Sequence, residues 1–369
     1  MAGELASLFI PLDWFVALQV IVLGFIGGVL SGFIGSGGAF FMTPGMMNLG
    51  VNGVVAVASN ITHKFGKAMM GAKKHGEMGN VDKKLALFML LTAFAGIRLA
   101  VWINSFLFRM AGDGHGEAQG AAANLYISVV FIGILTIVAI SMLRDVLQDR
   151  GEDGGPSKKI TEFLAQLHIP PIISFPVADV KVSLWIVLLV GLATGYLAGT
   201  IGVGGFIGVP AMIYVFGVPT AVAAGTELYL AMFMGAAGAL SYAWEGFVDL
   251  RLTMLLFIGS LLGIYMGAYG VKVVSEKYIR LVTGLIIAFC VVSRGVSVPV
   301  YLRQLGYLAL DPGLDRWLNG ASKFLLFASG ICAVVLILFN VFRAYSARKK
   351  IHTTLSYCQL PSQNGGMRT

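Results

Sequence analysis

The side chains with the most chemical potential lie in one otherwise apolar stretch, SNITHKFGKAMMG, which contains Asn60, His63, Lys64 and Lys67. On a helix, residues three or four positions apart lie on one face, so the three basic side chains would share a face. Charges inside a membrane-crossing helix are costly and by default mark a substrate pathway or a counter-ion. If these side chains lie deep, they supply positive potential for an anion. If the helix ends early, the lysines only extend back to the aqueous interface.

Two further ionisable side chains lie in apolar stretches. Glu227, preceded by Thr226 in AAGTELYLAMF, could relay a proton and so couple transport to proton movement, or it could pair with Lys64 or Lys67. Arg98 could hold an oxyanion through two parallel hydrogen bonds, or it could reach lipid headgroups or a packed carbonyl. The sequence leaves both pairs of alternatives open.

No metal, cofactor or catalytic residue is expected. The three cysteines show no paired spacing. Asp113, His115 and Glu117 lie close together in the loop MAGDGHGEAQG, and we interpret them as solvated polar residues rather than as metal ligands. An enzyme would need a convergent nucleophile–base or metal set, and the apolar segments offer few histidines for one. We therefore do not expect an enzyme.

The elements that must position these residues are membrane helices. Hydrophobic residues make up 57% of the chain and charged residues 12%, which is about half the charged fraction of a soluble domain. Apolar runs of roughly 20 residues recur, and that length crosses a bilayer as a helix because lipid offers no partner for unpaired backbone groups. The formal charge of +8 arises mostly in short loops, so we expect no nucleic-acid partner. The chain is interpreted as an all-α polytopic protein of the cytoplasmic (inner) cell membrane.

The pattern of apolar runs predicts nine spans in two repeats of about four helices each, with an extra C-terminal helix. The predicted spans cover about residues 14–33, 52–72, 85–108, 125–143, 184–201, 221–242, 252–274, 278–292 and 324–342. The corresponding divisions are a first transmembrane repeat at 1–143, a polar connector at 144–181, a second repeat at 182–295, a linker with the extra helix at 296–345 and a polar tail at 346–369. Within the connector, ITEFLAQLHI could form a short surface helix.

The positive charges of the loops give an orientation with one conflict. Lys73, Lys74, Lys83 and Lys84 lie between the second and third spans, and the positive-inside rule places that loop in the cytoplasm. With nine spans, the first terminus shares this face, whereas the basic cluster at 348–350 falls on the opposite one. A re-entrant segment or a miscounted span would remove the conflict.

The repeat is visible as an offset of 167 residues. At this offset six glycines of the first half fall on glycines of the second, and the polar stretch GxVDxK/RL recurs in the same order at Val81-Asp82 and Val248-Asp249. Substrate sites of duplicated transporters usually lie at the repeat interface, where helices are interrupted. Here the interruptions are GFIGSGGAFFMTPG and GTIGVGGFIGVP, whose glycines and proline should break a helix. The candidate substrate-binding residues of these breaks are Gly35, Ser36, Gly37 and Gly38 in the first, and Gly202, Gly204 and Gly205 in the second.

The relative direction of the two repeats is open. Four crossings in each unit imply parallel copies, and an odd count implies inverted ones. The glycines themselves also have a simpler interpretation, because small residues allow close helix packing.

Together, GGVLSGFIGSGGAFFMTP, its second copy GYLAGTIGVGGFIGVP, the VDLR stretch and the GxxxG-type spacing at Gly263 and Gly267 resemble the TauE/SafE sulfite exporter family. The resemblance covers roughly residues 14–110 and 182–295. It implies a duplicated multi-helix transporter that moves small sulfur-containing anions, such as sulfite or organosulfonates, across the cytoplasmic membrane.

The leading hypothesis is a secondary transporter, an exporter by resemblance, with alternating access at the interface of the two repeats. Its expected partners are a small anionic substrate, the lipid bilayer and, if Glu227 relays protons, a coupling proton. The alternatives are a membrane-embedded enzyme or accessory subunit of a sulfur-metabolising system, and a passive anion channel. No feature of the sequence encodes the oligomeric state, so a homo-oligomer stays open.

Overall fold

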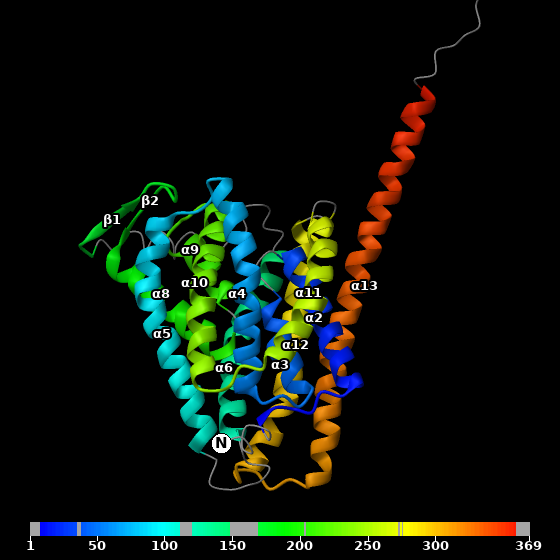
Figure 1. The fold of residues 1–369 in the computed structure, drawn as a ribbon. Helices are drawn as coiled ribbons and strands as arrows, with labels where there is room; N and C mark the ends of the chain where they lie inside the picture. The colour runs from blue at the N-terminus through cyan, green and yellow to red at the C-terminus, as the bar shows by residue number, and fades with distance from the viewer. Residues whose placement is uncertain are drawn as a thin grey trace, which may run out of the picture.

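The computed structural model of the protein describes residues 8–34, 38–110, 120–147, 169–202, 204–271, 274 and 276–358. Over these residues the fold is nearly all helical (Figure 1). The first half contains α2 (Trp14–Ile34), α3 (Ala39–Asn48), α4 (Gly53–Glu77), α5 (Lys83–Met110) and α6 (Ala121–Leu147). The second half contains α8 (Leu184–Ile201), α9 (Gly205–Tyr214), α10 (Thr220–Trp244), α11 (Leu250–Val271) and α12 (Glu276–Gln304). The last helix is α13 (Pro312–Cys358).

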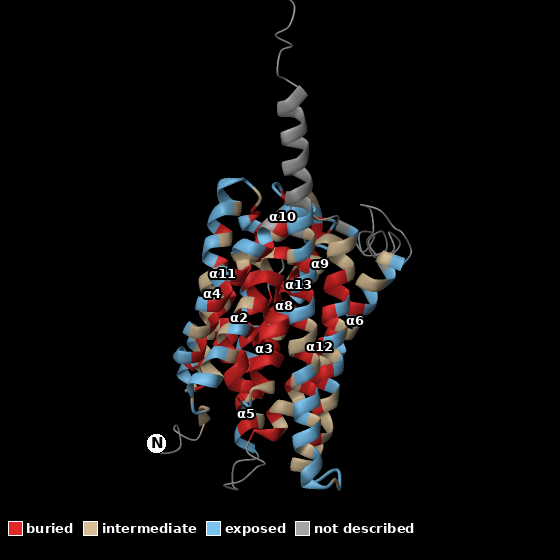
Figure 2. Cartoon of the chain, turned by 90° about the vertical axis from the view of Figure 1, so that its right-hand side faces the viewer, coloured by how far each residue is buried: buried red, intermediate tan, exposed pale blue. Residues whose placement is uncertain are grey.

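The expected polytopic, all-α membrane architecture is confirmed. Eight of the described helices are long and apolar enough to cross a membrane. Helix α4 has 25 residues but is not among the eight, and it carries His63, Lys64 and Lys67 in its middle. It nevertheless packs along α10 inside the bundle, whose interior is buried (Figure 2). The most polar helix is therefore also one of the central ones.

Each glycine-rich break is followed by a short helix that turns back. The first break returns antiparallel to α2, because Gly38 packs against the backbone of Gly27 and Gly45 against the side chain of Leu23. In the second, Gly202 ends α8 with φ of +76°, a conformation that glycine adopts without strain. The expectation that proline takes part in the breaks is wrong, since Pro44 and Pro210 lie inside the ten-residue helices α3 and α9. Of the two preceding helices, α8 ends at a glycine, Gly202.

The closest helix pairs each join one helix of the first half to one of the second: α2 packs on α11, and α5 packs on α8. We call these the exchanged pairs. Glycines make these contacts close: a Cβ added at Gly28 would lie 2.4 Å from the carbonyl oxygen of Ser260, and one at Gly195 would lie 2.1 Å from that of Ala93. Along α2 and α11 the contacts ascend together, from Gly24 against Leu256 to Gly32 against Ile264, so the two helices run parallel.

This packing assigns a direction to the two halves. Helices α2, α3, α4 and α5 alternate in direction, as short connections require, so α5 runs opposite to α2. Because α11 is parallel to α2, the helices α5 and α11 that the offset relates run in opposite directions. Figure 1 shows the same for α4 and α10. The geometry is that of inverted units.

The returning helix α3 also removes the conflict over orientation. It adds a third pass before the α4–α5 turn, so the expectation that the first terminus lies on the face of the lysine loops is wrong. In Figure 1 the start of α2 lies towards one side of the bundle, and the α4–α5 turn, the β1–β2 hairpin and the end of α13 lie at the other. The basic cluster at 348–350 belongs to that end of α13 and now shares the face of Lys73, Lys74, Lys83 and Lys84.

The repeated GxVDxK/RL stretch forms equivalent turns. Gly79 and Gly246 take φ of +74° and +82° after α4 and α10. Asp82 Oδ1 then accepts the backbone N–H of Leu85 at 2.9 Å, and Asp249 Oδ1 accepts that of Arg251 at 2.9 Å. Carboxylates at a helix start satisfy otherwise unpaired N–H groups. The motif therefore encodes the ends of α4 and α10 and the starts of α5 and α11.

The connector contains a hairpin that the sequence did not predict, β1 (Ile172–Phe175) paired antiparallel with β2 (Val180–Ser183). Asp82 Oδ2 accepts the backbone N–H groups of Val177 and Ala178, which fixes the hairpin on the α4–α5 turn. The surface helix considered for ITEFLAQLHI falls almost wholly outside the described residues. At the other end of the chain, α12 continues to Gln304 and α13 starts at Pro312, so the connection between them is short.

Candidate functional site

The two helix breaks meet at the centre of the bundle. Thr43 Oγ1 in α3 donates to the carbonyl oxygen of Ile201, the last residue of α8, at 3.1 Å. Asn60 Nδ2 in α4 donates to Thr43 Oγ1 at 2.8 Å and to the carbonyl oxygen of Ala39 at 3.1 Å. Asn60 is fully buried, so these bonds replace the water that its amide would otherwise bind. A chain of hydrogen bonds thus joins α4, α3 and the end of α8.

The basic face of α4 starts one turn further along. His63 Nε2 lies 2.7 Å from Ser260 Oγ of α11, and its ring packs on Phe257 with a centroid distance of 4.7 Å. Lys67 Nζ donates to Ser31 Oγ of α2 at 2.8 Å. Among the described residues, His63 and Lys67 are therefore held by hydroxyl groups and not by carboxylates.

Lys64 points to the second break. A Cβ added at Gly204 would lie 3.1 Å from Lys64 Nζ, so the absence of a side chain at Gly204 leaves room for the ammonium group. Among the residues that the structure describes, Lys64 Nζ has no hydrogen-bond partner and no carboxylate within ion-pair distance. A partly buried cation without a hydrogen-bond partner is costly, and an anionic ligand would offset that cost.

A cavity of about 400 Å³ opens beside this basic face. It extends from Asn60 and Ala39 at the breaks to Lys74 in the last turn of α4, and His63, Lys64 and Lys67 line it between. Apolar side chains from α3, α10 and α11 complete the wall: Met42, Leu228, Phe257, Leu261 and Ile264. Among the described lining residues there is no aspartate or glutamate. A site with one sign of charge and low-dielectric walls concentrates ions of the opposite sign.

Glu227 lies behind this cavity and does not line it. Its side chain is 4% exposed, and neither carboxylate oxygen has a hydrogen-bond partner among the described residues. It packs against Gly208 of α9, where a Cβ would lie 2.1 Å from Oε2. Lys64 is the charged group that acts on it electrostatically. The neighbouring Thr226 has a different role, because its hydroxyl accepts the backbone N–H of Asp82 at 3.0 Å and so holds the α4–α5 turn.

The remaining predicted site residues do not all join this centre. Arg98 is exposed on the outer side of α5, away from the cavity, and Tyr265, its counterpart at the 167-residue offset, lines the cavity. Gly38 and Gly205 are buried at the starts of α3 and α9. Gly35, Ser36, Gly37 and the loop with Asp113, His115 and Glu117 lie outside the described residues. Among the residues that are described, no group of three potential ligands could hold a metal.

Sequence reasoning missed the hydroxyl partners of the basic face. Ser31 and Thr43 were present in the glycine-rich motifs, where a polar residue between apolar neighbours was a usable signal. Ser260 carried no such signal, because only the packing of α11 against α4 places it beside His63.

Comparison with known proteins identifies similar sequences. The profile of the family described as "Sulfite exporter TauE/SafE" matches residues 20–294, which is most of the chain. The "Probable membrane transporter protein YjnA" of Bacillus subtilis (strain 168) is 26% identical over 254 residues, which cover 69% of this chain and 89% of the relative. The "Probable membrane transporter protein YdhB" of the same organism is 24% identical over 260 residues, which cover 68% of this chain and 89% of the relative.

Proposed function

Because the chain belongs to the sulfite exporter TauE/SafE family of membrane transporters, we propose that it is a secondary exporter of small sulfur-containing anions, such as sulfite or organosulfonates. Membership in this family makes the chain a multi-pass membrane transporter and not an enzyme. The observation that carries the substrate class is the cavity of about 400 Å³ with His63, Lys64 and Lys67 on its wall.

The chemistry of the wall suits an oxyanion that carries a small organic group. Lysine ammonium groups are compact charges on flexible stems, so they can follow the three oxygens of a sulfite or sulfonate group. The volume lies within the range of small-molecule sites, and the apolar wall of Met42, Leu228 and Phe257 would contact an alkyl substituent. Sulfite alone would fill only part of the cavity.

The helix breaks support alternating access between the two units. The cavity extends from the breaks towards the face of Lys74, and the hydrogen bonds from Asn60 through Thr43 to Ile201 close its inner end. Rocking of one unit against the other would break the contact between Thr43 and Ile201 and expose the substrate to the opposite face. A passive channel would need a continuous path past these residues.

Proton coupling is assigned to Glu227. A buried carboxyl without hydrogen-bond partners, under the influence of Lys64, can exchange a proton when substrate changes the local charge. Protonation would remove the attraction between Glu227 and Lys64 and leave the ammonium group free for the anion.

Counterflow in proteoliposomes tests the proposal. Vesicles that contain the protein and unlabelled sulfite should accumulate labelled sulfite transiently, because a carrier exchanges substrate across the membrane. Unlabelled methanesulfonate inside the vesicles should drive the same accumulation if sulfonates share the site. Simple equilibration without overshoot would favour a channel, and no flux of either anion would refute the substrate class.

A further inference from the structure

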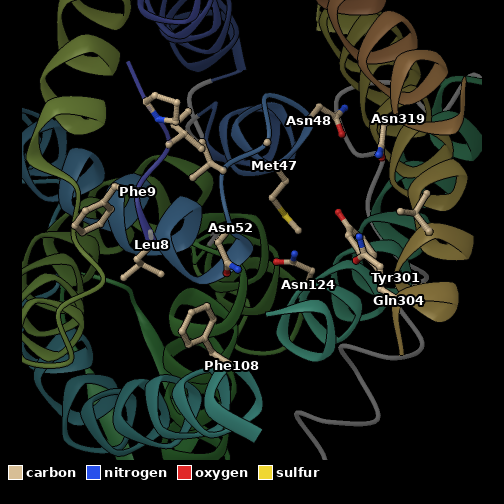
Figure 3. A pocket seen from close by; sticks show the side chains of 15 residues that line it. Leu8, Phe9, Met47, Asn48, Asn52, Phe108, Asn124, Tyr301, Gln304 and Asn319 are labelled. Atoms are coloured by element: carbon tan, nitrogen blue, oxygen red, sulfur yellow. The ribbon is translucent and has the colours of Figure 1, made fainter. Parts of the chain in front are cut away.

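A second polar cavity of about 430 Å³ lies on the opposite face of the molecule, where the N-terminal segment meets the ends of α3, α5 and α12 (Figure 3). We propose that it is a second binding site for the same class of oxyanion, used on the face opposite the lysines. This inference rests on the proposed function for the identity of the anion, and it goes beyond that function in placing a separate site. The argument depends on which atoms of the wall are free to donate.

Two asparagines present amide donors to the cavity because their oxygens are already used. Asn52 is the N-cap of α4, and its Oδ1 accepts the backbone N–H of Val54 at 3.1 Å. Asn124 Oδ1 accepts the backbone N–H of Gly53 at 2.7 Å. A backbone N–H can bond only to the amide oxygen, which settles the orientation of each side chain. In the described part of the chain, both Nδ2 groups are left without a hydrogen-bond partner.

The position of the Asn52 amide depends on the glycine at position 120. Gly120, at the start of α6, has φ of +79°, and a Cβ there would lie 2.0 Å from Asn52 Nδ2. A larger residue at Gly120 would displace the amide. In the view of Figure 3, Asn124 lies between Asn52 and Tyr301. Donors from three helices therefore surround the same space.

Arg294 of α12 supplies positive charge near the cavity. It does not line the cavity, but it bonds to two residues that do, Asn48 and Tyr301. Its side chain is 1% exposed and bonds to neutral groups, namely Asn48 Oδ1, Ser297 Oγ at 3.0 Å and Tyr301 OH at 3.3 Å. Within the described residues Arg294 makes no ion pair with a carboxylate. Because the Tyr301 oxygen accepts from Arg294, its own O–H proton is free to donate into the cavity.

These groups together form an anion site of a kind different from the lysine cavity. Neutral donors oriented by the backbone, with a guanidinium behind them, favour an oxyanion without a direct ion pair. Among the described lining residues there is no aspartate or glutamate. The expected affinity is lower than at the lysines, as suits a site from which substrate is released or first captured.

The decisive experiment measures equilibrium binding of labelled sulfite to the full chain in nanodiscs, with methanesulfonate as competitor. The background is the double variant Lys64→Ala, Lys67→Ala, which disables the lysine cavity. We expect saturable binding to remain in this background. Adding Asn52→Asp or Asn124→Asp should then weaken it by about tenfold or more, because each variant keeps the bond to the backbone N–H and replaces a donor by a negative charge.

Tyr307→Asp is the matched control, since it adds the same charge at an exposed position of the same face, outside the cavity. Tyr301→Phe, which removes only a hydroxyl, provides a second variant if the aspartates impair folding. The inference is overturned if the double-lysine background has no saturable binding, or if its binding is insensitive to Asn52→Asp, Asn124→Asp and Tyr301→Phe. Sulfite binding here without counterflow in the wild type would refute the proposed transport and leave this site standing.

Discussion

Helices α4 and α10 occupy equivalent places in the two halves of the molecule, yet only α4 carries the basic side chains of the proposed substrate site. At the 167-residue offset, His63, Lys64 and Lys67 correspond to Leu230, Ala231 and Met234. Both helices pass beside a glycine-rich break and both end in the same glycine turn. Similar backbone geometry with different side chains indicates that the break supplies the framework and that the charge must be supplied separately.

The same contrast holds for the residues beside the breaks. Asn60 ties α4 to α3 through Thr43. Glu227, at the matching position of α10, packs against Gly208 of α9 and has no hydrogen-bond partner among the described residues. The counterpart of Thr43 at the same offset is Pro210, which has no hydroxyl group. The Asn60 amide nitrogen donates two hydrogen bonds, which suits a fixed contact. A carboxyl that is not engaged suits a group that changes its protonation state.

The largest expected effect follows from removing the charge that distinguishes α4. Lys64→Met keeps most of the apolar stem and should reduce sulfite counterflow by about 100-fold, which corresponds to about 2.7 kcal/mol lost between a cation and its anionic ligand. Lys73→Met is the control, because Lys73 is exposed on the same helix and does not line the cavity. Equal counterflow in both variants would show that the asymmetry of charge has no role in transport.

The feature that both halves share, close glycine-mediated packing in the α2–α11 and α8–α5 pairs, is tested by measuring the stability of the protein. Gly28→Ala and Gly195→Ala place a methyl group against the backbone in the two exchanged helix pairs, so each should destabilise the protein by about 2 kcal/mol or more. The measurement is thermal unfolding in detergent, with Gly133→Ala as control since nothing lies near a Cβ there. A wild-type midpoint in either glycine variant would mean that its helix pair packs less closely than described.

The sequence predicts those parts of the fold that leave a pattern of hydropathy or of repeated residues, and it does not predict those that depend on packing between helices. The apolar runs predicted the helices. The offset showed that the GxVDxK/RL stretch recurs, but it did not predict the turns, in which Gly79 and Gly246 have positive φ and Asp82 and Asp249 cap helices. The returning helices α3 and α9 were not predicted, since ten residues are too short to be distinguished from a break by hydropathy. Arg98 and Ser260 could not be placed, because their helices are apolar on several sides and only packing decides which side faces the cavity.

A smaller effect is expected from Glu227→Gln, which keeps the shape of the side chain and removes its titration. Wild-type export should change in rate between acidic and alkaline buffer, whereas the variant should transport at a rate independent of pH. Rates are measured with labelled sulfite and an imposed pH gradient. An unchanged pH dependence in the variant would remove Glu227 from coupling and leave it as a partner of Lys64.

The smallest effect concerns the hydroxyl groups that hold the basic face. Ser260→Ala removes the partner of His63 and should raise the half-saturating sulfite concentration by about threefold to tenfold, because one net hydrogen bond is lost. The control is Arg98→Gln, at the exposed side of α5, for which we expect wild-type values. A stronger defect in Arg98→Gln than in Ser260→Ala would reverse the assignment of the two residues.

The central claim, that the basic face of α4 binds the anion, is tested most directly by locating an electron-rich analogue of sulfite. Selenite has the same pyramidal shape and charge, and anomalous diffraction from crystals soaked in it reports the position of the selenium. The account predicts a peak in the cavity between α4 and α11, within reach of the Lys64 and Lys67 ammonium groups. A peak beside α10, with none at these lysines, would contradict it.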